Sequence, residues 1–203
     1  MRVVVIGDSH AVGMRKAFQE LAARKGFELD MRAKGGTNTG QWAREQNPET
    51  RIPELEGAAY LVAILGTNDA GYGGKTFPGN LETILDKASA ELVPVIWAEP
   101  TGEQFSQYAQ IHAALNAAVQ DSGIQALVPH PPLPKYGDGV HLDPAGYAAW
   151  VDAIWTAVAE LEEPPATPPQ PKPPWSRPSP VVAVGAPLAV GLSAALTFWA
   201  LRR

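Results

Sequence analysis

Cysteine is absent from this chain of 203 residues. Without a thiol the protein can form no disulfide, no cysteine metal site and no cysteine nucleophile, although this absence does not fix the cellular compartment. Basic residues are also few, since 16 lysines and arginines stand against 21 aspartates and glutamates, and no basic stripe runs along the sequence. An acidic chain of this kind is not expected to bind nucleic acid.

A secretory leader is lacking at the amino terminus as well. Arg2 is followed by only four strongly apolar residues before Gly7 and Asp8. This run is too short for the apolar core of a signal peptide. We therefore expect the chain to begin directly with its first strand.

What the sequence does contain is a regular alternation of short apolar runs and longer helical patterns. Buried parallel strands are continuous apolar runs, whereas helices carry apolar residues at intervals of three to four. The pattern predicts strands at 3–6, 27–31, 59–65, 93–98 and 124–128, and helices at 11–25, 81–92, 103–122 and 144–161. Alternation of this kind indicates the α/β class, with a parallel five-stranded sheet between layers of helices.

Two connections are predicted to be less regular. Residues 41–57 have a weak pattern, which suggests a short helix and a loop. Residues 70–80 are rich in glycine and are expected to form a loop that lines or covers a pocket, with Asn80 as the cap of the next helix.

Asp143 and Pro144 form a strong helix start, because aspartate caps helices and proline is favoured at the first helical position.

The candidate site begins at Ser9. The first apolar run ends at Gly7, and Ser9 follows in the turn that leads into a helix. Ligands of open α/β sheets bind at this edge, and the free amides of a helix start stabilise negative charge there. Ser9 is therefore placed to act as a nucleophile if a base reaches it. The competing interpretation is a plain helix cap, since Asp8 and Ser9 are both residue types preferred at that position.

A base and its orienting group are available from a single later turn. Asp138 and His141 stand three residues apart, just before the last predicted helix. A nucleophilic serine needs a base within hydrogen-bonding reach and a third group that fixes the tautomer of that base. Asp138 and His141 can supply both to Ser9.

Donors for a developing oxyanion are available at the same edge. The tetrahedral intermediate of acyl transfer requires hydrogen-bond donors aimed at its oxygen. The Ser9 amide, an amide of the Gly35–Gly36 pair and the Asn68 carboxamide are candidates, because each follows a predicted strand. Taken alone, the glycine pair is equally typical of a turn that needs a positive φ.

Other polar and aromatic residues receive structural interpretations. Asp8 is expected to brace the turn by hydrogen bonding, and His10 to be a pocket or surface histidine rather than a second base. Trp42 is a possible loop contact. His112 and His130 are predicted to be structural or exposed. Core positions are predicted for Trp97, Trp150 and Trp155.

In these motifs the chain resembles the SGNH or GDSL hydrolases. The resemblance rests on Gly-Asp-Ser at Ser9, Gly-Gly-Thr at Gly36, Gly-Thr-Asn-Asp at Asn68, and Asp-x-x-His-Leu at Asp138 and His141, in that order over residues 1 to about 160. It implies a flavodoxin-like three-layer sandwich and ester hydrolysis without metal or cofactor. It also favours Gly36 over Gly35 as the oxyanion donor.

One residue departs from the usual pattern of that family. His10 stands where a leucine is usual, a variant also seen in SGNH domains associated with sugar acyl transfer. Hydrolysis and acyl transfer therefore both stay open. The α/β-hydrolase class fits less well, because its acid lies far upstream of the histidine and its fold needs more than about 160 residues.

The carboxyl-terminal part has a different composition. Residues 163–180 hold nine prolines, which predicts a semi-rigid linker after a catalytic domain at 1–162. Residues 181–201 carry no charge and precede the basic tail 202–203. As a helix this segment would span about 31 Å, close to the thickness of a bilayer core. We expect a single-pass membrane anchor in a cell or virion membrane, with its orientation open because basic residues flank both ends.

Three functional hypotheses follow. The first is a membrane-tethered serine esterase that removes O-acyl groups, with O-acetyl favoured, from a carbohydrate or cell-wall polymer. The second is a lysophospholipase or thioesterase with the same chemistry. The third is a non-catalytic binding module displayed on a membrane, which would leave Asp138 and His141 without a role.

Overall fold

Five parallel strands form one sheet in this computed structural model, which describes residues 1–45, 47–72, 74–132 and 138–162. The strands are β1 (Arg2–Gly7), β2 (Glu28–Ala33), β3 (Tyr60–Ile64), β4 (Val95–Ala98) and β5 (Ala126–Val128), and they lie in the order β2-β1-β3-β4-β5. The predicted parallel sheet is confirmed. Because the order reverses at β1 and β3, the carboxyl ends of these strands form the switch point where such sheets bind ligands.

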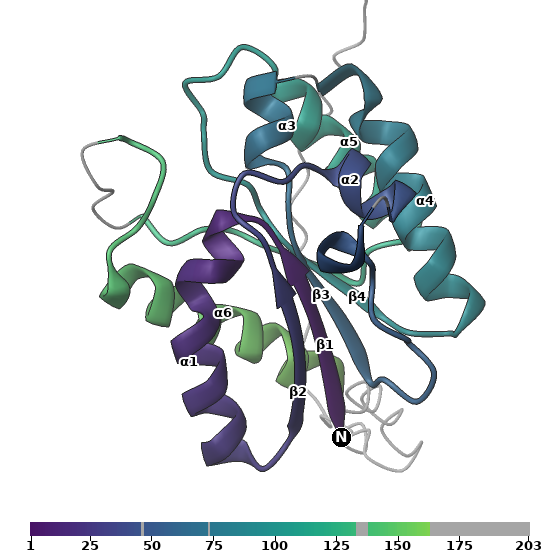
Figure 1. The fold of residues 1–203 in the computed structure, drawn as a ribbon, viewed down its shortest axis with the longest axis vertical. Helices are drawn as coiled ribbons and strands as arrows, with labels where there is room; N and C mark the ends of the chain where they lie inside the picture. The colour runs from purple at the N-terminus through teal and green to yellow at the C-terminus, as the bar shows by residue number, and fades with distance from the viewer. Residues whose placement is uncertain (46, 73, 133–137, 163–203) are drawn as a thin grey trace, which may run out of the picture. The chain divides into compact units, whose positions relative to one another are not determined.

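Helices cover both faces of the sheet (Figure 1). One face carries α1 (Ser9–Lys25) and α6 (Pro144–Glu162). The other carries α2 (Thr39–Arg44), α3 (Thr67–Tyr72), α4 (Phe77–Ala90) and α5 (Tyr108–Gln120), with the short 3₁₀ turns η1 (Pro48–Thr50) and η2 (Gly74–Thr76). The result is a helix–sheet–helix sandwich with the carboxyl ends of all five strands at one edge.

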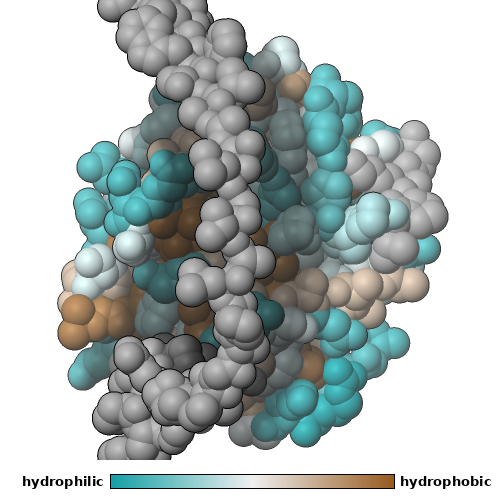
Figure 2. Space-filling model, turned by 180° about the vertical axis from the view of Figure 1, so that it is seen from behind, coloured by the Kyte–Doolittle hydropathy of each residue, from teal (hydrophilic) through white to brown (hydrophobic). Residues whose placement is uncertain are grey.

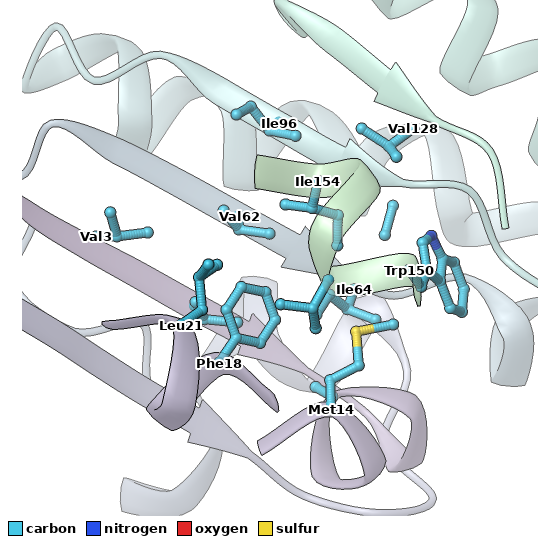
Figure 3. Close-up of a cluster of buried hydrophobic side chains, with 14 of the residues drawn as sticks. Val3, Met14, Phe18, Leu21, Val62, Ile64, Ile96, Val128, Trp150 and Ile154 are labelled. Atoms are coloured by element: carbon cyan, nitrogen blue, oxygen red, sulfur yellow. The ribbon is translucent and has the colours of Figure 1, made fainter. Parts of the chain in front are cut away.

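The core consists of two apolar layers that share the sheet. Side chains alternate between faces along a strand, so Val3 and Val5 of β1 pack toward α1 and α6, while Val4 and Ile6 pack toward the opposite helices. Figure 3 shows the first layer, in which residues from α1 and α6 meet those of the strands. Its labelled members are Val3, Met14, Phe18, Leu21, Val62, Ile64, Ile96, Val128, Trp150 and Ile154.

The predicted loop at 70–80 is wrong, because the described residues of this segment, 70–72 and 74–80, are helical. It contains the end of α3, the η2 turn and the start of α4 at Phe77. Phe77 is fully buried and meets Trp97 edge to face, with ring centroids 6.3 Å apart, so core packing draws the chain into a helix four residues earlier than its pattern indicated. Asn80 therefore lies inside α4 instead of capping it, and its Nδ2 donates to Oγ1 of Thr76 at 3.3 Å.

Two other helix starts also differ from the prediction. The first helix begins at Ser9 rather than at residue 11, because Oδ1 of Asp8 accepts the His10 amide at 2.9 Å and caps the helix. The last helix on the opposite face, α5, begins at Tyr108 rather than at residue 103. The connection before it buries Thr101 and turns at Gly102, whose φ is +107°.

Trp42 is a core residue, not a loop contact. Its side chain is fully buried on the α2 face of the sheet, and its indole Nε1 donates to Oγ1 of Thr37 at 3.0 Å. The predicted core positions of Trp97 and Trp150 are confirmed. Trp155 is half-buried and stacks on Phe27 with ring centroids 4.8 Å apart.

The chain divides into two compact units, Met1–Pro164 and Pro165–Arg203. The predicted linker at 163–180, the membrane segment at 181–201 and the basic tail at 202–203 lie outside the described residues. Within the part of the chain that the structure describes, no helix is both long and apolar enough to cross a membrane.

Candidate active site

The turn that carries Ser9 is held by the centre of the sheet. A side chain at Gly7 would place its Cβ 2.7 Å from the carbonyl oxygen of Ile64, so only glycine allows β1 and β3 to approach this closely. The next amide, from Asp8, donates to that same Ile64 oxygen at 3.1 Å. Ser9 follows as the first residue of α1, at the carboxyl end of β1.

His141 links Ser9 to Asp138. The Ser9 Oγ lies 2.8 Å from Nε2 of His141, and Oδ2 of Asp138 lies 2.7 Å from Nδ1 of the same ring. An ionised carboxylate can only accept hydrogen bonds, so Nδ1 carries the proton and Nε2 offers a lone pair to the Ser9 hydroxyl. The structure therefore brings the three residues into one hydrogen-bonded row, in the arrangement that a general base needs.

Asp138 organises its own turn. Its Oδ1 accepts the backbone amides of Val140 at 2.9 Å and His141 at 3.0 Å. The hydrogen bond from the His141 side chain, together with these two amides, holds the pKa of Asp138 well below its usual range. The carboxylate thus stays ionised and keeps the His141 ring oriented. The following residues enter α6 as predicted, since Oδ1 of Asp143 caps the Gly146 amide at 2.7 Å.

The first residue of the glycine pair, Gly35, lies beside Ser9. A Cβ built on Gly35 would lie 3.8 Å from the Ser9 Cβ, whereas a Cβ on Gly36 would meet no atom within 4 Å. Gly36 has a φ of +75°, a conformation that favours glycine. Both residues thus stand at the edge that carries Ser9, and the geometry favours neither amide as the oxyanion donor.

Asn68 is fixed by the loop that follows the glycines. Its Nδ2 donates to the carbonyl oxygen of Thr37 at 2.8 Å and lies 3.5 Å from Oδ2 of Asp8. Asp69, the next residue, takes two hydrogen bonds from the amide and hydroxyl of Thr39 at 3.0 and 2.6 Å. These bonds tie the start of α3 to the loop after β2 and to the start of α2, and they hold Asn68 beside Asp8, the residue before Ser9.

Two buried carboxyl groups lie beneath this edge. Burial raises the pKa of Asp8 to about 7, against the lowering effect of the hydrogen bond from the His10 amide, and the nearby Asp69 adds to the rise. Burial also raises the pKa of Asp69, against the hydrogen bonds from Thr39. Asp8 braces the turn as expected, through its bond to the His10 amide.

His10 is the residue that sequence reasoning placed least well. The structure excludes a surface position, because His10 is 1% exposed. Its Nε2 lies 2.9 Å from Oγ1 of Thr101, its Nδ1 lies 3.3 Å from the hydroxyl of Tyr147, and its ring lies 5.0 Å from that of His141. The departure from the usual leucine was the signal that could have drawn attention to it.

The two cavities described lie away from these residues. The larger, of about 710 Å³, lies between α4 and α5 beside Leu85 and Val93, and the smaller, of about 290 Å³, lies beside Arg32 and Ile52. Figure 2 shows hydrophobic residues among hydrophilic ones on the face that is hidden in Figure 1. Among the described residues, no cluster of three or more histidines, aspartates and glutamates could hold a metal ion.

A parallel α/β sandwich that delivers a serine, a histidine and an aspartate to one edge of its sheet is the architecture of a serine hydrolase. A family model agrees. The GDSL-like lipase/acylhydrolase family matches residues 5–149, and the chain belongs to that family. No curated protein matches the sequence.

Solved structures of low sequence identity share the fold. A lipase/acylhydrolase from Enterococcus faecalis superposes with a TM-score of 0.64 at 18% identity, over 82% of this chain and 100% of that one. The psychrotrophic esterase EstA from Pseudoalteromonas sp. has a TM-score of 0.62 at 15% identity, over 79% of this chain and 97% of that one. A carbohydrate esterase family 3 protein from Talaromyces cellulolyticus has a TM-score of 0.60 at 16% identity, also over 79% of this chain and 97% of that one.

Proposed function

We propose that this hydrolase cleaves an O-acyl ester, with O-acetyl as the preferred group, on a carbohydrate or cell-wall polymer. Ser9 is the nucleophile, His141 the general base and Asp138 the group that orients the base. The observation that carries the proposal is the row of hydrogen bonds from Ser9 through His141 to Asp138, at 2.8 and 2.7 Å. Such a row is the shared feature of serine nucleophiles on unrelated folds.

The reaction takes place in two steps. In the first, Ser9 Oγ bonds to the carbonyl carbon while its proton passes to Nε2 of His141, and the alcohol leaves with that proton when the carbon–oxygen bond breaks. In the second, water attacks the acyl-serine, His141 takes the proton of the water, and Ser9 regains a proton as the acid departs. Asp138 remains ionised throughout and stabilises the imidazolium.

The oxyanion hole is assigned to the Ser9 amide, the Gly36 amide and the Asn68 carboxamide, with Gly35 as the alternative glycine. One N–H of Asn68 is used on the Thr37 carbonyl at 2.8 Å. The contact with Asp8 at 3.5 Å is too long to be a strong bond. The second N–H of the same nitrogen is therefore the donor available for a substrate oxygen.

The exposure of the site favours a bulky polymer over a long acyl chain. The side chain of His141 is 35% exposed and that of Asp138 is 50% exposed, so substrate can approach from solvent. Neither described cavity includes Ser9 or His141. A carbohydrate esterase is among the proteins of the same fold. These observations favour the polymer esterase over a lysophospholipase or thioesterase.

We also propose that residues 181–201 anchor the enzyme in a cell or virion membrane, with 163–180 as a spacer. The uncharged segment has the length of a bilayer span. A tether of this kind would concentrate the active site near a membrane-associated polymer. The orientation of the domain is part of the proposal that a protease-protection assay on intact cells or vesicles would decide.

The experiment that tests the function compares substrates on the full chain. Purified protein in mild detergent is given acetylated xylan, p-nitrophenyl acetate and lysophosphatidylcholine, and is labelled in parallel with a fluorophosphonate probe. We expect labelling of the native enzyme but not of Ser9→Ala, and release of acetate from xylan faster than fatty acid from the lysolipid. Preferential lysolipid hydrolysis would favour the lysophospholipase, and an unlabelled native protein would exclude the Ser9 mechanism.

A further inference from the structure

His10, the residue after Ser9, makes hydrogen bonds to which the proposed mechanism assigns no role. His10 is 1% exposed and lies in the first turn of α1, directly after Ser9. A buried imidazole without a role is uncommon, because each polar group taken from water must regain its hydrogen bonds. His10 regains them from two hydroxyl groups, Thr101 after β4 and Tyr147 on α6.

These two bonds fix the plane of the His10 ring. Nε2 meets Oγ1 of Thr101 at 2.9 Å, and Nδ1 meets the hydroxyl of Tyr147 at 3.3 Å. Thr101 is fully buried and Tyr147 is 6% exposed, so both partners are themselves held by the core. The Tyr147 ring fits because residue 13 is glycine, where a Cβ would lie 2.4 Å from that ring. Three separate parts of the fold therefore converge on His10.

The fixed ring lies against the base. The ring centroids of His10 and His141 are 5.0 Å apart with an interplanar angle of 30°, a separation at which rings are in contact. His141 has its two nitrogens bonded to Ser9 and Asp138, yet Asp138 and His141 come from a half-exposed turn. Among the described contacts of the His141 ring, His10 is the buried aromatic neighbour.

We propose that His10 is a positioning residue for His141. Hydrogen bonds with Thr101 and Tyr147 fix both nitrogens of its ring. The fixed ring packs against the His141 imidazole and keeps it aligned between Asp138 and Ser9. The proposal rests on the proposed esterase function but adds a residue that moves no proton and touches no substrate. Its role is to limit rotation of the base, which matters because small misplacements of reacting groups cost large factors in rate.

The surroundings of His10 decide which form of its ring can serve. Among the residues that the structure describes, the titratable groups near it include His141, with Asp138 behind, Tyr147 from α6, and Asp8, whose carboxyl receives the His10 amide. Both ring nitrogens of His10 meet hydroxyls, which can donate or accept, so the neutral ring is satisfied in either tautomer. A neutral ring adds no positive charge beside the imidazolium that forms on His141.

The test uses the full-length enzyme and three variants. His10→Leu removes both fixing bonds while keeping the bulk of the side chain. His10→Gln keeps an amide that can bond to Thr101, and Thr101→Val leaves the His10 ring in place but removes one of its partners. The matched control is His112→Gln, an exposed histidine on α5 that pairs with Glu99. Measurements are kcat and KM for p-nitrophenyl acetate, the pH profile, and the proton NMR signal of the His141–Asp138 hydrogen bond.

If His10 positions the base, His10→Leu lowers kcat about 10- to 100-fold with KM within about twofold, the size expected when a reacting group is misplaced. His10→Gln retains part of the lost rate, Thr101→Val loses less than His10→Leu, and the control changes nothing. The low-field proton signal between His141 and Asp138 broadens in His10→Leu, because a mobile ring exchanges that proton with water. The pH profile of kcat also changes in His10→Leu, because the pairing of His141 with Asp138 weakens.

The opposite result is equally clear. A folded His10→Leu with native kcat, an unchanged pH profile and a sharp low-field signal would show that His10 only packs the core. If His10→Leu does not fold, Thr101→Val decides, since a native kcat and signal there would overturn the proposal. Failure of the esterase assignment looks different, because the native enzyme itself would then hydrolyse no ester and take no fluorophosphonate label.

Discussion

The two sides of the active site are held by different physical means. The nucleophile side is part of the core, since Asp8 and His10, which flank Ser9, are each 1% exposed, and β1 behind them is buried. The base side is a half-exposed turn, in which the Asp138 and His141 side chains are 50% and 35% exposed. Backbone hydrogen bonds to Asp138 hold that turn together.

Because of this difference, substitutions on the two sides are expected to affect catalytic rate and folding stability differently. Substitution of a buried polar residue on the nucleophile side leaves partners unpaired in the core and lowers the free energy of unfolding. Substitution on the base side removes few buried contacts, so it changes rate with little effect on folding. Comparison of activity with stability across the two sides is therefore the sharpest test of how the site is built.

The largest effect is expected for substitutions in the hydrogen-bonded set of Ser9, His141 and Asp138. Ser9→Ala and His141→Ala should each lower kcat on the order of 10⁵- to 10⁶-fold, because each removes a group without which the others have no function. The double variant should lose little more. Turnover of p-nitrophenyl acetate measures the rates, and urea denaturation serves as the control that both single variants fold normally. If each single variant loses only a few-fold in kcat, or if the two losses multiply in the double variant, the three hydrogen-bonded residues have a structural role.

Asp138→Asn is expected to cost less than His141→Ala. The asparagine leaves the base in place but weakens its orientation, and the expected loss in kcat is about 10³- to 10⁴-fold. The pKa of native Asp138 is held below its usual range, so this carboxylate is already ionised where the enzyme works. Turnover of p-nitrophenyl acetate by the two variants measures the difference. A loss in Asp138→Asn as large as that in His141→Ala would contradict this division of roles.

The sequence predicted the three hydrogen-bonded residues better than their surroundings. Ser9 was identifiable because it follows a strand and a glycine, and Asp138 and His141 because they stand just before a helix start; the parallel order of strands determines which edge they share. The same reasoning predicted Asp143 as the cap of α6, and the structure confirms it. Short-range patterns of this kind are readable because their causes are local.

What the sequence could not predict depends on contacts between distant residues. The helical path of 70–80 follows from burial of Phe77 against Trp97, and the burial of His10 follows from hydroxyls that lie 91 and 137 positions away. Trp42 was misplaced for the same reason, since its side chain belongs to the buried apolar cluster that includes Leu61 and Phe77. Glycine-rich composition suggested a loop, but tertiary packing overrode that local preference.

For the proposed oxyanion hole, an effect of intermediate size is expected. Asn68→Ala should lower kcat about 10²- to 10³-fold, the loss typical of one side-chain donor. Asn116→Ala on the exposed face of α5 is the matched control and should leave the rate unchanged. Because Asn68 also bonds to Thr37, a parallel denaturation curve separates a lost donor from a loosened loop. A near-native rate in a folded Asn68→Ala would restrict Asn68 to a structural role.

On the nucleophile side, a pH-dependent change in stability is expected from Asp8. Its pKa is raised to about 7 in the native protein by burial, whereas in the unfolded chain it is about 3.9. Between these values the native state binds the extra proton, so the free energy of unfolding falls as pH rises from about 4 to about 7. Asp8→Asn removes this penalty and can still accept the His10 amide.

The variant should therefore gain stability relative to the native protein as the pH rises, by about 2–4 kcal/mol at pH 8. Urea denaturation at pH 5 and pH 8 measures the difference. Asp69 is present in both proteins, but it interacts with Asp8, so its own titration also changes in the variant and the measured difference reports the coupled pair. If the difference between the two proteins is the same at both pH values, Asp8 does not titrate in this window.

The smallest effect on turnover is expected from the end of the chain. Both sides of the site and both apolar layers of the core lie within residues 1–162. Deletion of 180–203 should therefore leave kcat for p-nitrophenyl acetate and the urea midpoint unchanged, because no described contact of the site is removed. The same deletion should abolish co-sedimentation with phosphatidylcholine vesicles, which the full chain is expected to show through its uncharged 21-residue segment. If the shortened protein instead aggregates or loses its fold, residues 181–201 belong to the core and the anchor assignment is wrong.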